Sequence, residues 1–215
     1  MVLRMEKLIL IGAGGYAKSV LDSLDYYNYE VAGFLDEFSD KKEHLGYPVL
    51  ANKLSDLDEP QKYVYFITIG DNKHRKNWYD RLVDLELRMI NIVDSSAIIS
   101  PRARIGNGCF VGKMAIINSE SSIGNNCIIN TKALVEHGCT VEDHVNLSTN
   151  SVINGDVRVG KGTFIGSCSV TAGQKLIGEW VIIGAGSVVI DNVEEGNVIA
   201  GVPAKLIRKE IISHE

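Results

Sequence analysis

A glycine-rich turn near the start of the chain has the spacing of a phosphate-binding loop. Gly12, Gly14 and Gly15 follow an aliphatic run and precede a helical pattern that begins at Tyr16. Between a strand and a helix, glycines let a phosphate group approach the backbone N–H groups of the helix N-terminus. Asp36 ends the next aliphatic run, near where dinucleotide folds place an acid that binds a ribose. The motif is therefore either a nucleotide-binding loop or a tight turn without a ligand.

A nicotinamide-dependent enzyme is the first hypothesis that this motif suggests, and the rest of the chain argues against it. Residues 1–90 supply only half of a full dinucleotide-binding sheet. No later segment has the residues of a hydride-transfer site.

His137 is the second candidate for chemistry, because an imidazole can take a proton from a nucleophile near neutral pH. It follows Glu136 in a segment of short aliphatic runs. Most exposed histidines are only solvated, and the residues alone leave that alternative open. His74, at the start of a predicted helix, and His144 are weaker candidates.

The composition is that of an ordinary globular protein, with 215 residues, 45% of them hydrophobic and 23% charged. A net charge of −5 without a cluster of lysines and arginines argues against a nucleic-acid partner. No apolar run approaches the ~18 residues of a membrane span, and the first residues do not form a secretory signal. We therefore expect a cytoplasmic protein without a membrane partner. The four cysteines contain no CxxC motif, so neither disulfides nor a metal site is expected.

Residues 1–90 alternate between strand and helix patterns. Aliphatic runs predict strands at Lys7–Ile11, Val31–Leu35 and Tyr63–Ile69. Apolar residues recur at helical spacing in Tyr16–Tyr26 and His74–Leu87. This order predicts a small parallel α/β domain, a Rossmann-like half domain.

Residues 91–195 carry a six-residue repeat. Every sixth residue from Val93 to Val189 is aliphatic except Thr171, and the residue four places later is small or β-branched except Lys175. These two positions share one face of a strand and point inward, and the residues between them form a corner where Gly and Asn tolerate positive φ. Three six-residue sides close one coil, so position i+18 stacks on position i, which predicts a prism-shaped parallel β-helix. We expect a local bulge at Lys175.

The chain from Lys7 to Lys205 resembles the hexapeptide-repeat acyltransferases, in particular the bacterial sugar acetyltransferases that act on nucleotide-linked amino sugars or on sialic acid. The motifs that carry the resemblance are Ile11-Gly12-Ala13-Gly14-Gly15, Phe34-Leu35-Asp36-Glu37, Ile69-Gly70-Asp71-Asn72, Val135-Glu136-His137 and Gly201-Val202-Pro203-Ala204-Lys205. The resemblance implies a left-handed β-helix, a handedness that the periodicity does not supply.

The resemblance also implies roles for individual residues. The catalytic group would be His137 as general base with Glu136 beside it, and Gly155 as a candidate oxyanion donor. The same glycine is placed next to His137 by the coil, because equivalent positions of successive coils stack. The acceptor sugar nucleotide would be held by Gly14, Gly15, Tyr16, Asp36, Glu37 and Gly70. The co-substrate acetyl-CoA would be held by Asn146, Gly155, Ser167 and Ala185.

Two positions depart from the pattern of the subfamily. Gly138 stands where the subfamily usually has an acid that orients the histidine, and either Glu136 or Asp143 could replace that acid. Asn146 stands where a second histidine usually contacts the acetyl donor, and His144 falls two residues earlier. The amide of Asn146 can still donate a hydrogen bond to the donor.

We expect three parts: residues 1–90 as a nucleotide-sugar-binding domain, residues 91–195 as a β-helix for acetyl-CoA, and residues 196–215 as a tail. The expected activity is transfer of acetyl from acetyl-CoA to the amino group of a nucleotide-linked sugar by a homotrimer without a metal. The first alternative is O-acetylation of sialic acid or a related sugar. The second is a catalytically inactive trimer with a structural or binding role.

Overall fold

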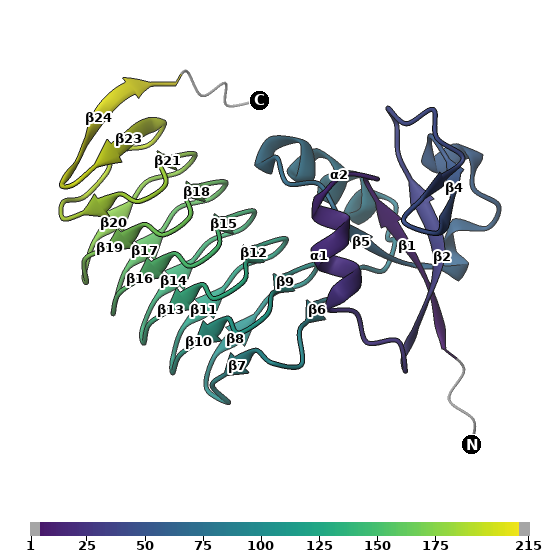
Figure 1. Ribbon diagram of the computed structural model, residues 1–215, viewed down its shortest axis with the longest axis horizontal. Coiled ribbons are helices and arrows are strands. Elements are labelled where there is room, and N and C mark those ends of the chain that lie inside the picture. Colours follow the sequence, from purple (N-terminus) through teal and green to yellow (C-terminus); the bar gives the residue numbers. More distant parts are fainter. Residues whose placement is uncertain (1–4, 211–215) are drawn as a thin grey trace. The chain divides into compact units, whose positions relative to one another are not determined.

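The computed structural model describes residues 5–210 and divides into two compact units whose boundary lies between Val93 and Asp94 (Figure 1). Each unit has its own cluster of buried hydrophobic residues. The first unit is an α/β domain, and the second is a stack of very short parallel strands.

The N-terminal unit is built on a five-stranded sheet with the strand order β3-β4-β2-β1-β5. The strands are β1 (Glu6–Ile11), β2 (Tyr29–Leu35), β3 (Glu43–His44), β4 (Tyr47–Ala51) and β5 (Val64–Ile67). β1 pairs in parallel with β2 and β5, β2 pairs in parallel with β4, and β3 is antiparallel to β4. All four residues of β5 are buried, as are the last four of β1, which is typical of parallel strands covered on both faces.

The two α-helices follow two neighbouring strands of the sheet, α1 (Tyr16–Asp22) after β1 and α2 (Asn72–Asp84) after the edge strand β5. Two short 3-10 helices, η1 (Leu54–Asp56) and η2 (Pro60–Lys62), precede β5. α1 ends earlier than the periodicity predicts, because Asp25 accepts hydrogen bonds from the backbone N–H of Tyr27 and the amide of Asn28 and so forms a turn.

The C-terminal unit is a parallel β-helix whose strands form three faces (Figure 1). The first face holds β7 (Ile98–Ile99), β10 (Ile116–Ile117), β13 (Leu134–Val135), β16 (Val152–Ile153), β19 (Val170–Thr171) and β22 (Val188–Val189). The second face holds β8 (Arg104–Ile105), β11 (Ser122–Ile123), β14 (Thr140–Val141), β17 (Arg158–Val159) and β20 (Leu176–Ile177). The third face holds β9 (Phe110–Val111), β12 (Ile128–Ile129), β15 (Asn146–Leu147), β18 (Phe164–Ile165), β21 (Ile182–Ile183), β23 (Asn197–Gly201) and β24 (Ala204–Lys209). The sheet of this face begins with β6 (Ile92–Val93), the last strand before the boundary between the units.

The predicted length of the coil is confirmed by the strand register. On the first face Ile117 pairs with Val135, and Val135 pairs with Ile153. The two predicted inward positions form the core of the unit: Val135 and the small Cys139 that follows it are both fully buried. Stacking of identical positions thus buries one continuous narrow core along the prism.

The corners of the prism share one backbone conformation. Every sixth residue from Gly108 to Gly186 has a φ between 52° and 70°, and most of these residues are not glycine. The left-handed residue is always the one directly before the second inward position. From Asn126 to Gly186 its N–H donates to a carbonyl of the preceding coil, as Asp156 does to His137 at 2.9 Å. A non-glycine residue in this conformation costs roughly 1 kcal/mol, which the coil-to-coil hydrogen bond helps to offset.

The bulge that we predicted at Lys175 is wrong. The strands on both sides of it keep the register of the other coils, and Gln174 has the same left-handed φ as the other corners. Lys175 is only half-buried, so its long side chain is accommodated without a change in the backbone.

The tail continues the third face of the prism. β23 pairs in parallel with β21, and β24 returns antiparallel to β23. The last five residues of the predicted tail lie outside the described part of the chain. Within residues 5–210, none of the helices is both long and apolar enough to cross a membrane.

Candidate active site

Six residues predicted to hold an acceptor line one cavity of the N-terminal unit. The cavity has a volume of about 410 Å³ and is lined by Gly14, Gly15, Tyr16, Asp36, Glu37 and Gly70 together with Ile11, Gly12, Leu35, Phe38, Thr68, Ile69, His74 and Trp78. It lies where β1, β2 and β5 end, which is where open parallel sheets bind ligands.

The glycine-rich loop packs closely against the segment after β5 at its first glycine and has free space beside its other two glycines. Gly12 has a φ of +103°, and a β-carbon there would lie 2.7 Å from Cγ1 of Ile69. A β-carbon on Gly14 or Gly15 would meet nothing within 4 Å. The first glycine therefore fits the loop against the end of β5, while the other two leave free space beside the backbone.

Asp36 holds the loop in place. Its Oδ2 accepts a hydrogen bond from the N–H of Ala13 at 2.6 Å, and its Oδ1 accepts one from the N–H of Phe38 at 2.9 Å. The carboxylate thus connects the end of β2 to the glycine-rich loop by hydrogen bonds, and it also lines the cavity.

Another part of the cavity wall is formed by side chains that the sequence interpretation had not connected. Glu37 pairs with Arg81 at 2.6 Å and lies 3.9 Å from Nε2 of His74. The ring of His74 also packs edge-on against Phe38, with 5.8 Å between the centroids. His74 and Trp78 are one helical turn apart on α2, so their shared face is a signal that the sequence already contained.

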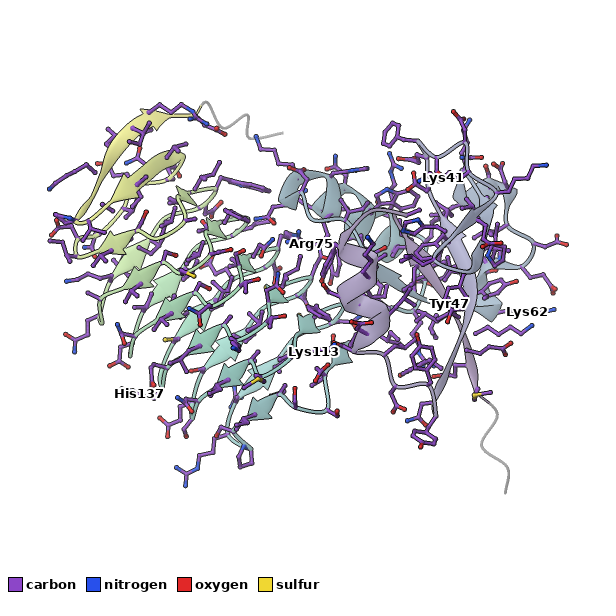
Figure 2. The ribbon with its side chains drawn as sticks, viewed as in Figure 1. Lys41, Tyr47, Lys62, Arg75, Lys113 and His137 are labelled. Carbon is purple, nitrogen blue, oxygen red and sulfur yellow. The ribbon has the colours of Figure 1, made fainter. Side chains whose placement is uncertain are left out.

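His137 lies in a second cluster, on the edge of the prism between the first and second faces. It directly follows β13, is exposed, and is labelled on the outer edge of the β-helix in Figure 2. Its ring lies against Gly155 of the next coil: a β-carbon on Gly155 would lie 2.5 Å from Cε1 and 2.7 Å from Nε2. The stacking of the two residues that the coil arithmetic predicts is therefore present.

The backbone around His137 is held on both sides. Its N–H donates to Oε2 of Glu136 at 3.3 Å, and its carbonyl accepts from the N–H of Asp156 at 2.9 Å. In the part of the chain that the structure describes, the N–H of Gly155 makes no hydrogen bond. A free donor therefore lies beside the imidazole.

The two acids considered as replacements at position 138 differ in their positions. Asp143 lies on another edge of the prism, where its Oδ1 accepts from the N–H of Asn125 at 2.6 Å. Glu136 remains beside His137. A third acid is present that the sequence interpretation missed: a β-carbon on Gly138 would overlap Oδ1 of Asp156. Asp156 stacks on Gly138 from the next coil, which is a signal that the repeat contained.

The residues predicted to hold acetyl-CoA fall into two groups. Gly155 lies with His137, whereas Asn146 lies on β15 of the third face and Ser167 and Ala185 follow strands of that face. Ser167 shares a hydrogen bond of 2.8 Å with the hydroxyl of Ser148, and the buried Oδ1 of Asn146 has no partner. Within one chain the two groups lie on different edges and do not form one site.

His144 lies at a third position, on the edge between the second and third faces. It is only 2% exposed, and its Nδ1 lies 2.9 Å from Nδ2 of Asn126. It therefore does not join His137, and its contacts are those of a packed corner residue.

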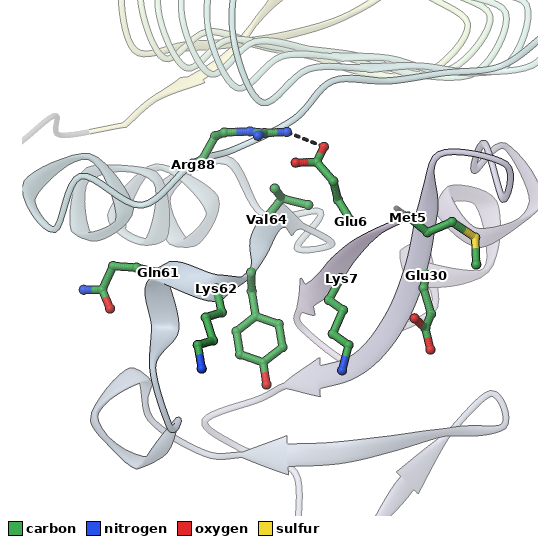
Figure 3. A pocket seen from close by; sticks show the side chains of 9 residues that line it. Met5, Glu6, Lys7, Glu30, Gln61, Lys62, Val64 and Arg88 are labelled. Atoms are coloured by element: carbon green, nitrogen blue, oxygen red, sulfur yellow. Dashed lines mark hydrogen bonds and ion pairs between the residues drawn. The ribbon is translucent and has the colours of Figure 1, made fainter. Parts of the chain in front are cut away.

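A larger hollow of about 830 Å³ lies at the opposite end of the N-terminal sheet and contains none of the predicted residues (Figure 3). Its walls include the start of β1 and of β5, and an ion pair of 2.5 Å joins Arg88 to Glu6. Among the described residues no group of three or more His, Cys, Asp and Glu side chains could hold a metal ion.

Comparison with known proteins gives structural matches over nearly the whole chain. Residues 7–82 match the family model of the PglD N-terminal domain. A histidine-to-asparagine mutant of perosamine N-acetyltransferase from Caulobacter crescentus, solved with CoA and GDP-perosamine, is 33% identical, with a TM-score of 0.90 over 97% of this chain and 100% of that one. The acetyltransferase domain of PglB from Neisseria gonorrhoeae, solved with acetyl coenzyme A, is 29% identical, with a TM-score of 0.89 over 95% of this chain and 100% of that one.

A curated relative, the uncharacterized protein L142 of Acanthamoeba polyphaga mimivirus, is 33% identical over 103 residues. The match spans 48% of this chain and about a fifth (20%) of the length of that relative. The structural matches confirm the predicted fold class, a Rossmann-like half domain followed by a left-handed parallel β-helix.

Proposed function

The chain belongs to the hexapeptide-repeat family of sugar acetyltransferases, and from this we propose that it moves the acetyl group of acetyl-CoA to the amino group of a nucleotide-linked amino sugar. The observation that carries the proposal is the match over 97% of the chain to a perosamine N-acetyltransferase that was solved with CoA and GDP-perosamine. The donor acetyl-CoA is shared with the Neisseria relative, whose structure contains it.

The acceptor binds in the cavity of the N-terminal unit. The cavity volume of about 410 Å³ is in the range of small-molecule sites. The free space beside Gly14 and Gly15 supports contact between backbone N–H groups and a phosphate. Asp36 and Glu37 shape the wall that faces the rest of the nucleotide-linked sugar.

His137 acts as the general base. It takes a proton from the acceptor amine as the nitrogen attacks the thioester carbonyl, and the free N–H of Gly155 beside it donates to the developing oxyanion. The new C–N bond replaces the C–S bond, and the proton held by His137 passes to the departing thiolate. Glu136 holds the N–H of His137 and thereby helps to fix the base. No metal is part of this proposal.

A homotrimer completes the site. Within one chain Gly155 and the group formed by Asn146, Ser167 and Ala185 lie on different edges. An acetyl-CoA bound between two copies would contact Gly155 of one copy and this group of the other. The outward residues of the first face support this, because they form an unbroken aliphatic row of Ile98, Ile116, Leu134, Val152, Val170 and Val188. The second face is polar in four of the five corresponding positions: Arg104, Ser122, Thr140 and Arg158. Acetyl-CoA and nucleotide sugars are cytoplasmic metabolites, so the enzyme works in the cytoplasm.

The test is release of the CoA thiol from acetyl-CoA with a panel of acceptors. The panel holds amino sugars linked to GDP, UDP and dTDP, and free and CMP-linked sialic acid. Turnover with an amino-sugar nucleotide that falls at least about 100-fold in His137→Ala, while acetyl-CoA still raises the Tm of the variant, supports the proposal. Turnover with sialic acid alone would replace it by O-acetylation, and binding without turnover on any acceptor would favour a catalytically inactive protein.

A further inference from the structure

The residue after His137 is Gly138, which has no side chain, and Asp156 of the next coil fills the space beside it. Gly138 has a φ of +68°, and Oδ1 of Asp156 overlaps the position that its β-carbon would take. Asp156 occupies the same corner position one coil further along the prism. The carboxylate of Asp156 therefore stands over the residue that directly follows His137.

The backbone fixes Asp156 relative to His137. The N–H of Asp156 donates to the carbonyl of His137, while the N–H of Gly138 donates to the carbonyl of Ser119 at 3.0 Å. The imidazole itself lies against Gly155, the residue before Asp156. The ring and the carboxylate thus meet at one corner, through two adjacent residues of the next coil.

The charge of Asp156 reaches this corner. Burial raises the pKa of the Cys139 thiol, and the carboxylates of Asp156 and Glu136 raise it further. Cys139 directly follows Gly138, so the carboxylate of Asp156 lies near the segment that carries His137.

The other acids near the corner are less suited to orient the ring. Glu136 already accepts the N–H of His137, Asp143 is on another edge, and the exposed Glu120 lies 3.8 Å from Arg102. Glu120 and Asp156 also flank position 138 from the coils on either side, about 4.8 Å away each. An acid at 138 would therefore meet like charges on both sides, which gives a physical reason for the glycine.

We propose that Asp156 is the positioning residue for His137, supplying from the next coil the carboxylate that the chain lacks at position 138. The inference rests on the proposed function of His137 as general base. The structure has no direct hydrogen bond between the two described side chains, so Asp156 acts by its charge: it favours the ring orientation with an N–H toward it and stabilises the imidazolium that forms when His137 takes the proton.

The first test is Asp156→Asn, which keeps the shape and removes the charge. We expect kcat to fall roughly tenfold, with the KM for acetyl-CoA unchanged. Glu120→Gln is the matched control, because it removes a carboxylate from the other side of Gly138, and its kcat should stay within about twofold of wild type. Equal losses in both variants, or none in Asp156→Asn, would overturn the inference.

A reciprocal exchange tests position rather than net charge. Gly138→Asp combined with Asp156→Gly moves the carboxylate from one coil to the other and puts glycine in a left-handed corner, which it tolerates. Recovery of kcat to within about threefold of wild type supports a positioning role. If the exchange is no faster than Asp156→Gly alone while its Tm is that of wild type, the inference fails.

A measurement without substrates separates this inference from the proposed function. The ¹⁵N shifts of the His137 ring, assigned with His137→Ala, report the ratio of its two neutral tautomers. One tautomer should predominate in wild type and in Glu120→Gln, and the ratio should move toward the ordinary mixture in Asp156→Asn. An unchanged ratio in Asp156→Asn contradicts the inference even if the enzyme turns over, whereas a changed ratio in an enzyme without turnover contradicts only the function.

Discussion

The imidazole of His137 fills the space in which a side chain of residue 155 would stand: a β-carbon on Gly155 would lie 2.5 Å from Cε1, 2.7 Å from Nε2 and 3.2 Å from Nδ1. No positive φ demands glycine at this position. The glycine is therefore required by the neighbouring ring rather than by the turn. A substitution of Gly155, in the next coil, can therefore test the position of the His137 ring.

Gly155→Ala should displace the ring of His137 without breaking the corner. We expect kcat to fall by about one to two orders of magnitude, because a shift of about 1 Å at a catalytic group costs that much, and the Tm to fall by only a few degrees. Steady-state kinetics and thermal denaturation check this. Gly173→Ala is the control one coil further on, since its β-carbon would meet the carbonyl of Gly155 at 3.1 Å and no atom of His137. Equal activity loss in both variants would speak against a specific effect on the ring.

Asp36→Asn should weaken binding of the acceptor and leave the donor site unchanged. The amide cannot accept both the Ala13 and the Phe38 N–H groups, so one of the two bonds that shape the loop is lost. A hydrogen bond to a charged group is worth about 1.5 kcal/mol or more, which corresponds to a KM for the sugar nucleotide raised roughly tenfold. Kinetics with each substrate varied in turn measure both KM values. Asp40→Asn, at an exposed position four residues on, should change neither.

Leu134→Glu should break the assembly of the enzyme. Leu134 is half-buried in the aliphatic row of the first face, and a carboxylate there would be buried against the next copy. We expect light scattering after size exclusion to show smaller species than wild type, with loss of turnover. Thr140→Glu places the same charge at a half-buried position on the polar second face and should keep the assembly. A wild-type mass for Leu134→Glu would show that another face forms the interface.

The four cysteines should react in two classes. Cys109, Cys127 and Cys139 are buried and Cys168 is exposed. The pKa of Cys139 is raised by burial, so its thiol stays protonated to higher pH than a free cysteine and is a poor nucleophile at pH 8. Ellman's reagent should therefore titrate one fast thiol in the folded protein and all four in guanidinium chloride. The fast phase should disappear in Cys168→Ser, and its persistence would contradict the assignment.

The prism could be predicted from the sequence because the same inward-facing positions recur in each six-residue side. Val135 and Cys139 occupy the two inward positions of the pattern, and both are fully buried. The corner conformation is less visible, because Lys132 and Trp180 adopt the same left-handed φ as Gly138 and Gly162. At these corners the hydrogen bond to the preceding coil stabilises the left-handed conformation, so the residue type does not predict it.

The candidate site was only partly predictable. The glycine-rich loop and Asp36 belong to one local motif, so their shared cavity followed from a short stretch of chain. Phe38 and Trp78 come from separate elements that only the folded unit brings to the same wall. Asp156 was predictable from the stacking that paired His137 with Gly155, but a side chain that folds back over Gly138 depends on the contacts of the folded corner.

The strict stacking of one coil on the next also sets which changes in length the protein can accept. Inserting or deleting one whole coil beyond Asp156 would lengthen or shorten the prism and leave every later residue on its original edge. Inserting a single six-residue side would instead move Ser167 and Ala185 to the next edge, away from the third face on which they now follow β18 and β21. The prism therefore accepts changes in length only in multiples of one complete coil. Related proteins can differ in length by whole coils while the edge that carries His137 keeps its structure.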